Sequence, residues 1–366
     1  MWGYCEMNHT CRDVHIFIGG LERGGTQRNC VNIANMLFSN GHSVEITTVR
    51  NVDNDGYKDD LCHGVLLRTL NRESTIHSII PLIKVISKIN KDTTILIMNY
   101  ELLPFIVLVS KCLRKKSRIV VRNMNYISKS MASKNRGIFT IVQKYLMLLT
   151  FPLTDVVVHQ CNAMKKDFHS YCLFQPKHST VIKNVVNFPK KNLPATIAQN
   201  PYLLLVGRLV EQKNIRLAID ILKALHNKSY ELNLIVIGEG DLLSDLQDYA
   251  DRLGLLQYIK FLGRKNNVNE YYFSAHATIL TSNYEGFPNV LIESMSCGTP
   301  VVAHNCKSGP EELIVNGENG FLVGFQNILE FVDAIIKIKN IDRSSISSTI
   351  TAFLPANVYK DYSKIL

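Results

Sequence analysis

The chain has 366 residues, of which 46% are hydrophobic and 20% are charged, and its formal net charge is +10. A chain of this length exceeds one ordinary hydrophobic core and predicts a globular protein of two domains. Its nine cysteines include no CxxC pair and no Cys/His spacing suited to zinc, which argues against a disulfide framework and a metal site.

The first 50 residues contain the pattern of one βαβ unit. Apolar, β-rich stretches at residues 13–20 and 42–49 predict two strands, and helical apolar spacing over residues 30–41 predicts the helix between them. Gly24 and Gly25 in the first connection would let the backbone approach a phosphate or a sugar closely. Because the connection is neither G-x-G-x-x-G nor a P-loop, an ordinary structural turn explains it equally well.

Three stretches of the first half are assigned no special chemistry. Residues 1–12 are polar and lack the basic start and apolar core of a signal peptide, so we expect a flexible extension. Asp53–Asp55 is an Asp-x-Asp sequence, but it lies in a hydrophilic excursion and does not fit a calcium loop. The apolar run at residues 145–158 is interrupted and is shorter than the about 20 residues of a spanning helix, so it predicts a buried helix followed by a strand.

The rest of the chain alternates strands and helices, which predicts parallel, doubly wound sheets. In the first half, further strands are expected at residues 65–70, 93–99, 117–123, 155–160 and 178–187. Residues 187–201 contain three prolines and predict a linker. The pattern then restarts, with strands expected within residues 202–214, 231–241, 259–264, 276–282, 299–305 and 321–323.

The positive charge is concentrated in the first half of the chain. Residues 1–200 hold 26 Lys and Arg against 13 Asp and Glu, whereas residues 201–366 hold 15 against 18. A basic domain could meet anionic lipid at a membrane surface, where each nearby Lys or Arg contributes about 1 kcal/mol. Nucleic acid is disfavoured, because the chain shows no nucleic-acid motif and no interleaving of aromatic and basic residues. A solubilising surface is the remaining interpretation.

The sequence SNYEGFPNVLIESMSCGTPVV, residues 282–302, predicts a tight acidic loop between a strand and a helix. Pro288 suits the first position of the helix and Gly298 suits its end. The free backbone N–H groups and the positive dipole end of such a helix are a natural seat for a diphosphate. Glu293 lies about 7.5 Å further along the helix axis and could reach a sugar hydroxyl while Glu285 stays at the loop. Two solvated glutamates are the alternative.

Six segments of the second half occur in an order and spacing that resembles the retaining family-4 glycosyltransferases, or glycosyl transferases group 1. They are GRLVEQKN, VIGEGD, FLGR, SNYEGFPNVLIESMSCGTPVVAHN, SGPEEL and NGENGFLV. Two glutamates separated by seven residues are that family's signature, and Glu285 and Glu293 match it. GGTQRN near the start is similar to the family's N-terminal glycine loop, so the resemblance covers nearly the whole chain.

The resemblance implies the GT-B fold, in which two Rossmann-like α/β domains with doubly wound parallel sheets face a central cleft. We therefore expect an acceptor-binding domain at residues 1–190, a linker at 191–201 and a nucleotide-sugar-binding domain at 202–340. A tail helix within residues 341–366 would cross back to the first domain. The resemblance implies no metal and no other cofactor, because the nucleotide sugar is a co-substrate.

The resemblance also assigns a donor site and catalytic roles to Glu285, Arg208 and Lys213. Arg208 and Lys213 match the pair that grips the donor diphosphate, a role suited to cations beside a breaking glycosidic bond. Glu293 resembles the carboxylate that binds the ribose hydroxyls, and Glu285 the group that holds the donor sugar. The remaining donor-side positions are the backbone after Glu285, the base-framing loop and the N-terminal glycine: Gly286, Phe287, Pro288, Asn289, Arg264 and Gly25.

The acceptor side departs from the family pattern. Many relatives carry R-x-H-N, whereas this chain has Arg122-Asn123-Met124-Asn125, so Met124 stands where the histidine would be. A methionine cannot take up a proton. Arg122, Asn123 and Asn125 are therefore the acceptor-side candidates, and no general base is assigned. His159 is a more distant candidate and is better interpreted as a core histidine.

These observations give the hypothesis of a cytoplasmic, metal-independent, retaining glycosyltransferase that is peripheral on the inner face of the cell membrane. It would use a UDP-sugar and an undecaprenyl-diphosphate-linked saccharide in O-antigen, lipopolysaccharide or capsule synthesis, with its basic domain on an anionic membrane surface. The alternatives are a transferase for a soluble acceptor, another GT-B enzyme such as an epimerase, and a non-catalytic paralogue that binds a nucleotide sugar.

Overall fold

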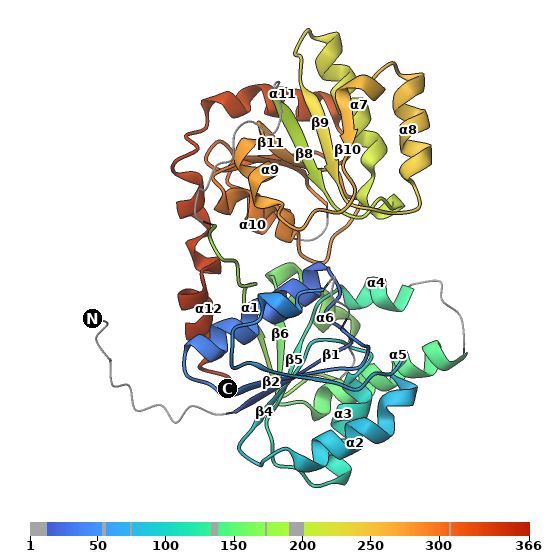
Figure 1. Ribbon diagram of the computed structural model, residues 1–366, viewed down its shortest axis with the longest axis vertical. Coiled ribbons are helices and arrows are strands. Elements are labelled where there is room, and N and C mark those ends of the chain that lie inside the picture. Colours follow the sequence, from blue (N-terminus) through green and yellow to red (C-terminus); the bar gives the residue numbers. More distant parts are fainter. Residues whose placement is uncertain are drawn as a thin grey trace, which may run out of the picture. The chain divides into compact units, whose positions relative to one another are not determined.

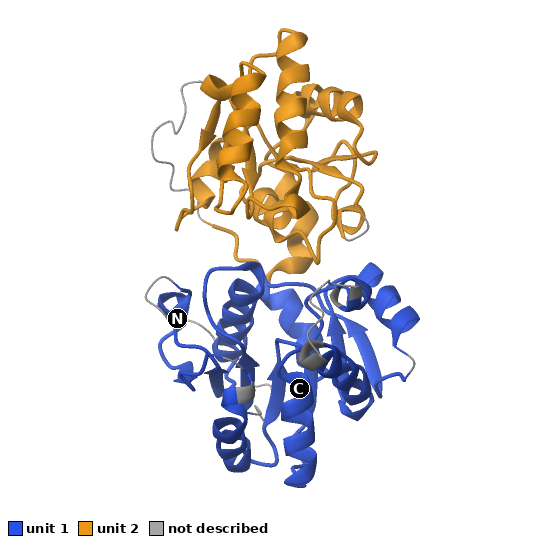
Figure 2. Cartoon of the chain, turned by 90° about the vertical axis from the view of Figure 1, so that its right-hand side faces the viewer, with its two compact units in different colours: residues 1–185, 355–366 blue, residues 186–354 orange. Residues whose placement is uncertain are grey.

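The computed structural model describes residues 13–52, 56–73, 75–132, 138–172, 174–189, 201–306 and 309–366. The extension at residues 1–12, the Asp53–Asp55 sequence and residues 191–200 of the expected linker lie outside the described residues. The chain divides into two compact units, which Figure 2 colours separately: unit 1 is Met1–Val185 with Pro355–Leu366, and unit 2 is Val186–Leu354.

Unit 1 is built on a seven-stranded sheet in which every neighbouring pair is parallel, in the order β3-β2-β1-β4-β5-β6-β7 (Figure 1). Its strands are β1 (Val14–Ile18), β2 (Val44–Thr48), β3 (Leu66–Thr69), β4 (Thr94–Ile97), β5 (Ile119–Arg122), β6 (Val156–His159) and β7 (His178–Val181). Strands β4, β5 and β6 are buried at every position, as expected of parallel strands that are covered on both faces.

Helices cover both faces of this sheet. Its helices are α1 (Gly25–Ser39), α2 (Ile79–Lys88), α3 (Leu103–Cys112), α4 (Ile127–Ala132), α5 (Ile138–Thr150), α6 (Asn162–Tyr171) and α12 (Pro355–Tyr362). One apolar core joins α1 and α12 to the sheet, and the other joins α2, α3 and α6 to the opposite face. Helix α12 packs against α1, so a segment from the end of the sequence completes the first unit (Figure 1).

Unit 2 repeats the architecture with six parallel strands in the order β10-β9-β8-β11-β12-β13. Its strands are β8 (Tyr202–Val206), β9 (Asn233–Ile237), β10 (Ile259–Phe261), β11 (Ala277–Leu280), β12 (Val301–His304) and β13 (Gly320–Val323). Its helices are α7 (Ile215–Asn227), α8 (Leu243–Arg252), α9 (Asn269–Ser274), α10 (Asn289–Ser296) and α11 (Ile328–Lys337). The predicted class, two parallel and doubly wound α/β sheets, is confirmed.

Helix α5 differs from the sequence-based expectation of a buried helix. Met147 is buried and α5 packs against α3, but four apolar side chains on the rest of α5 stay exposed. We call them the α5 stripe: Ile141 (42% exposed), Val142 (48%), Tyr145 (60%) and Leu149 (57%). Neither α5 nor any other helix within the described part of the chain combines the length and apolarity needed to cross a membrane.

Candidate functional site

The strand order of unit 2 reverses between β8 and β11, which are neighbours in the sheet although two strands, β9 and β10, separate them in sequence. In open parallel sheets, ligands bind at the carboxyl ends of the strands beside such a reversal. The loops that leave β8 and β11 there contain residues 207–213 and 281–288. These two loops hold most of the donor-side residues expected from the sequence.

An ion pair joins the two loops. Lys213 Nζ lies 2.7 Å from Glu285 Oε1, and the two side chains are only 15% and 8% exposed. Lys213 ends a short 3-10 helix, Glu211–Lys213, and Glu285 lies five residues after the end of β11. The ammonium group has three donors, and among the described residues only Glu285 accepts from it, so the other donors could still bind an anion.

Further hydrogen bonds fasten the same loops along their length. Thr281 Oγ1 donates to the carbonyl of Lys213 (2.9 Å), and the Asn283 backbone N–H donates to the carbonyl of Gln212 (2.8 Å). Gln212 Nε2 returns a hydrogen bond to the carbonyl of Tyr284 (2.9 Å). The ion pair therefore sits on a rigid support rather than on two independently moving loops.

Glycines allow the loop after β8 to pack backbone against backbone with the loop after β9. Gly238 has φ +144°, and a Cβ placed on it would lie 1.8 Å from the carbonyl oxygen of Gly207. A Cβ on Gly240 would lie 2.4 Å from the carbonyl oxygen of Leu209. A Cβ on Gly207 would come within 3.2 Å of the Lys213 side chain. The Gly-x-Gly turn thus supports the segment that presents Arg208 and Lys213.

The two arginines of the expected donor site are exposed at this edge of the sheet. The Arg208 guanidinium has no hydrogen-bond or ion-pair partner within the described residues, which leaves its donors available. Arg264 follows β10, and its Nη2 lies 3.5 Å from Glu239 Oε2 in the neighbouring loop. Arg264 is thereby oriented by Glu239, whereas no described residue forms a hydrogen bond or an ion pair with the Arg208 side chain.

Helix α10 begins at Asn289, so Pro288 is the N-cap residue (φ −82°, ψ 76°) and not the first helical residue that the sequence suggested. Phe287 anchors the turn, because its ring packs against that of Phe353 with centroids 6.0 Å apart. A Cβ on Gly309 would lie 3.1 Å from both Phe287 and Pro288, which shows how closely another backbone segment covers this turn.

Glu293 lies one turn into α10 and is partly exposed. Its Oε2 accepts a hydrogen bond of 3.1 Å from the hydroxyl of Tyr272, a side chain of α9 that is wholly buried. Tyr272 was not expected from the sequence, because only the fold brings residues 272 and 293 together. One carboxylate oxygen is thereby held in place while the other faces a different direction.

The acceptor-side candidates in unit 1 differ greatly in exposure. Arg122 is wholly buried and donates to Tyr362 Oη (2.7 Å), Asn184 Oδ1 (2.7 Å) and the carbonyls of residues 182 and 183. Asn123 is also wholly buried, with its Nδ2 3.0 Å from His159 Nδ1. Asn125 is exposed, so it is the one of the three that a ligand could touch.

His159 behaves as a core residue. It is 0% exposed, and burial lowers the pKa of its imidazole to about 3. Its Nε2 lies 3.0 Å from Ser179 Oγ, so both ring nitrogens are occupied. A ring with these partners is a poor proton acceptor for an external substrate.

Gly25 is the first residue of α1 in unit 1, whereas the other donor-side residues belong to unit 2. The loop before it is fixed by a hydrogen bond from the Gly19 N–H to Asn99 Oδ1 (3.0 Å). This bond spans β1 and β4, where the strand order of unit 1 reverses. Within the described ranges of both units, no group of three or more His, Cys, Asp or Glu side chains could hold a metal ion.

Comparison with known proteins agrees with the motifs and with the fold. Residues 190–347 match the family model of glycosyl transferases group 1. The chain is 29% identical over 239 residues, 64% of each protein, to N-acetylgalactosamine-N,N'-diacetylbacillosaminyl-diphospho-undecaprenol 4-alpha-N-acetylgalactosaminyltransferase of Campylobacter jejuni. It is 26% identical over 318 residues to the amylovoran biosynthesis glycosyltransferase AmsD of Erwinia amylovora, covering 85% of this chain and 86% of AmsD.

Among solved structures, HepE of Anabaena in complex with UDP and glucose superposes with a TM-score of 0.78. The match covers 96% of this chain and 98% of HepE, at 18% sequence identity. At this identity the similarity establishes the common fold of the two proteins.

Proposed function

This chain belongs to the glycosyl transferases group 1, the family-4 glycosyltransferases with the GT-B fold, and on that premise we propose that it moves a sugar from a UDP-sugar to a saccharide acceptor with retention of configuration. The observation that carries the proposal is the largely buried Lys213–Glu285 ion pair at the strand reversal of unit 2. Arg208 lies in the same loop as Lys213 and has no partner among the described residues. Most of the donor residues that we propose belong to the two loops that leave β8 and β11 there.

The two cations would hold the diphosphate. As the glycosidic bond breaks, negative charge grows on the departing diphosphate, and fixed cations stabilise that charge most where water is excluded. Lys213 is held in place by Glu285, and Arg208 is available to close on the ligand. The backbone N–H groups at the start of α10 and the positive end of that helix would add further stabilisation.

Glu293 and Glu285 would position the two ends of the donor. Because Tyr272 fixes one oxygen of Glu293, its carboxylate is oriented to accept hydrogen bonds from the vicinal hydroxyls of a ribose. Glu285 lies at the loop before α10, where the donor sugar would be attached to the diphosphate. Arg264, oriented by Glu239, would border the base. UDP is proposed as the nucleotide because the similar HepE was solved with UDP.

Retention without a protein base is compatible with the residues present. Met124 cannot take up a proton, and His159 is buried with its pKa lowered to about 3. We infer that the acceptor attacks on the face from which the nucleotide leaves and that the departing phosphate oxygen takes the acceptor proton. The bond from the sugar's anomeric carbon to the phosphate oxygen breaks, and the bond to the acceptor oxygen forms.

The proposed acceptor is a saccharide linked to undecaprenyl diphosphate in cell-surface polysaccharide synthesis. Two observations support a membrane-borne acceptor: the α5 stripe exposes apolar side chains, and residues 101–150 hold ten basic residues against one acidic residue. Helix α3, which packs against α5, is followed by the exposed Arg114 and Lys116. Apolar and basic side chains together favour the surface of an anionic membrane. The similar C. jejuni protein is named for a diphospho-undecaprenol substrate.

The experiment is transfer from a panel of nucleotide sugars to an undecaprenyl-diphosphate-linked saccharide, with binding of each donor followed by thermal stabilisation. Arg208→Ala and Glu285→Ala should each lower kcat/KM by at least about 100-fold. Glu211→Ala is the matched control, because Glu211 is an exposed glutamate in the same pair of loops. Unchanged turnover in both variants would overturn the assignment, and UDP binding without transfer to any acceptor would favour a non-catalytic binding protein.

A further inference from the structure

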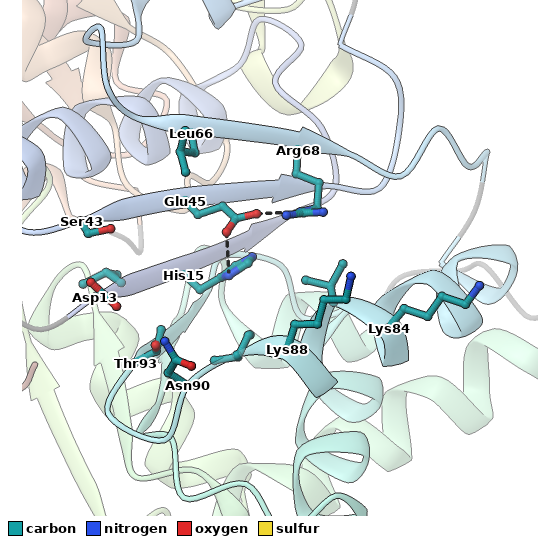
Figure 3. A pocket seen from close by; sticks show the side chains of 13 residues that line it. Asp13, His15, Ser43, Glu45, Leu66, Arg68, Lys84, Lys88, Asn90 and Thr93 are labelled. Carbon is teal, nitrogen blue, oxygen red and sulfur yellow. Dashed lines mark hydrogen bonds and ion pairs between the residues drawn. The ribbon is translucent and has the colours of Figure 1, made fainter.

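Unit 1 contains a cavity of about 360 Å³ that none of the residues discussed above lines (Figure 3). It is bordered by Asp13 at the start of β1, by Ser43 before β2 and by Thr93 before β4, and on another side by α2. These are the amino ends of the strands. The cavity therefore lies toward the end of the sheet opposite the glycine loop that follows β1.

A ladder of polar side chains crosses three neighbouring strands in this cavity (Figure 3). Glu45 of β2 is central, with Oε1 2.6 Å from Arg68 Nε of β3 and Oε2 3.7 Å from His15 Nδ1 of β1. The other ring nitrogen of His15 lies 2.8 Å from Thr47 Oγ1. The ladder fixes His15 and Glu45, so the floor of the cavity is preorganised.

This polar face is unusual for a parallel sheet, whose strands are ordinarily apolar on both faces. The opposite face of β1 and β2 follows that rule, because Val14, Ile16, Val44 and Ile46 enter the core beneath α1. On the cavity side the apolar core formed with α2 reaches β1 and β4 through Phe17 and Ile95. From β1 toward β2 and β3 this face becomes polar. No segment of the described chain fills the cavity in front of it.

Helix α2 contributes two lysines to the lining of the cavity. Lys84 and Lys88 are four residues apart, so they lie on one side of the helix, and both line the cavity (Figure 3). Both are exposed, and their ammonium groups have no hydrogen-bond or ion-pair partner within the part of the chain that the structure describes. Among the described residues the Arg68 guanidinium donates a hydrogen bond only from Nε, to Glu45, which leaves its two terminal nitrogens available.

The lining therefore offers a cationic side and a side that pairs with hydroxyls. Three cations, Arg68, Lys84 and Lys88, outweigh Glu45 and the exposed Asp13. Burial lowers the pKa of His15 to about 4, so its imidazole is neutral at pH 7 and adds no positive charge to the lining. Carboxylate, amide and hydroxyl groups beside the cations are the partners that sugar hydroxyls use, and the volume falls in the range of small-molecule sites.

We propose that this cavity is a second ligand site, which binds one sugar unit that carries an anionic group. The anion lies between Lys84, Lys88 and the terminal guanidinium nitrogens of Arg68, and the hydroxyls of the sugar pair with Glu45 and Thr93. A free sugar phosphate and a uronic acid unit of a polysaccharide share this chemistry. The site is independent of the donor-site residues and of the proposed transfer reaction.

The test measures binding to the full chain by calorimetry, in the presence of saturating UDP to occupy the donor site. The probes are a hexose 6-phosphate, a hexuronate, a short uronate-containing oligosaccharide, neutral glucose and inorganic phosphate. We expect saturable binding of at least one anionic sugar, stronger than that of glucose or phosphate. Preference for the hexose phosphate would identify a free metabolite as the source, and preference for the oligosaccharide a polysaccharide chain.

The discriminating variant is Lys84→Ala/Lys88→Ala, which removes two exposed side chains and leaves the core intact. It should weaken the binding of the anionic sugar at least about tenfold. Its charge-matched control, Lys91→Ala/Lys260→Ala, also removes two exposed lysines but touches neither the cavity nor the donor loops. The proposal would be overturned if both double variants bound the anionic sugar equally well, or if no probe bound saturably. It would also be overturned if glucose or inorganic phosphate bound as tightly as the anionic sugar. Transfer activity is not the readout, so these outcomes do not bear on the proposed reaction.

Discussion

Arg122 and Tyr362 are 240 positions apart in the chain and are joined inside unit 1 by a hydrogen bond of 2.7 Å. The Arg122 side chain is wholly buried, and each acceptor that it meets, two carbonyls, Asn184 and Tyr362, is uncharged. A buried cation without a carboxylate partner depends on every hydrogen bond that it keeps. The contact therefore fastens α12 to the end of β5.

Tyr362→Phe should reveal this dependence. The substitution removes one hydroxyl and leaves a guanidinium donor unsatisfied in the core, which we expect to lower the free energy of unfolding by about 1–3 kcal/mol. Urea denaturation measures the change. Tyr171→Phe is the control, because Tyr171 is 42% exposed in the same unit. Equal stability of the two variants would show that Arg122 does not rely on Tyr362.

The Lys213–Glu285 pair should behave as a coupled unit in the ligand-free protein. Either Lys213→Met or Glu285→Met leaves a poorly exposed charge without its counter-charge, and each should destabilise unit 2 by about 3 kcal/mol. The double variant Lys213→Met/Glu285→Met should recover most of that loss, because neither charge remains. Thermal unfolding of the four proteins gives the coupling energy. Additive effects would mean that solvent, not the partner, balances each charge.

Gly238→Ala should disrupt the loop that presents Arg208. The added Cβ would lie 1.8 Å from the Gly207 carbonyl oxygen, so the two backbones must separate. Gly254 is the matched control, because it also has positive φ (+69°) but nothing within 4 Å of its Cβ position. We expect Gly254→Ala to cost about 1–2 kcal/mol of left-handed strain. Gly238→Ala should cost more than about 4 kcal/mol in unfolding experiments. A similar cost for both would refute the role assigned to close backbone packing.

The α5 stripe should control membrane association. Val142→Ser/Tyr145→Ser removes apolar area from the stripe and should lower the fraction of protein that sediments with anionic vesicles, about tenfold or more. Leu66→Ser/Leu329→Ser is the control, because these leucines are 62% and 68% exposed but lie outside α5. High salt should weaken the binding of the unmodified chain, because the basic residues contribute through screened charges. Binding that is unaffected by the stripe variant would assign membrane contact elsewhere.

Unit 1 should lose stability on acidification below about pH 6.5. The native-state pKa of His159 is about 3 and that of His15 about 4, both lowered mainly by burial. Since each lies below the value of 6.5 for an unfolded histidine, the unfolded chain binds protons first as the pH falls toward 4. Each histidine should therefore lower the free energy of unfolding by at most about 1.4 kcal/mol for each pH unit between 6.5 and 4.

Urea unfolding at pH 7 and pH 5 tests this expectation. His159→Gln should reduce the difference between the two pH values, because it removes a side chain that must stay neutral in the core. His63→Gln, at an exposed position, should leave the difference unchanged. A pH dependence that survives in His159→Gln at full size would assign the effect to other groups.

Local pattern was enough to predict the strands and the fold class. Each expected strand is present, because apolar runs separated by helical spacing can satisfy their hydrogen bonds only within parallel sheets. Local pattern also located the loops after β8 and β11. It could not show that Lys213 contacts Glu285, because the two are 72 positions apart and meet only through the order of the strands.

Exposure was less predictable than strand position. Arg122 was an acceptor-side candidate because Arg122–Asn125 corresponds to the family's R-x-H-N pattern, but it is wholly buried among neutral partners from two distant segments, residues 182–184 and Tyr362. The apolar run at residues 145–158 was expected to form a buried helix and a strand, yet Tyr145 and Leu149 of the α5 stripe are exposed although α5 packs against α3. In both cases the exposure of the side chains depends on which distant segments pack against them. The sequence of a single helix or strand does not specify those segments.

The placement of α12 in unit 1 sets the order in which this protein can be completed. A ribosome finishes residues 13–185 of unit 1 and must then make all of Val186–Leu354 before α12 emerges. At about 5–20 residues per second that interval is on the order of ten to thirty seconds. During this time the apolar seat of Val358 and Tyr362 is vacant and Arg122 lacks one of its acceptors. The first unit to be synthesised is thus the last to be closed, and nascent chains would offer chaperones and proteases a defined window.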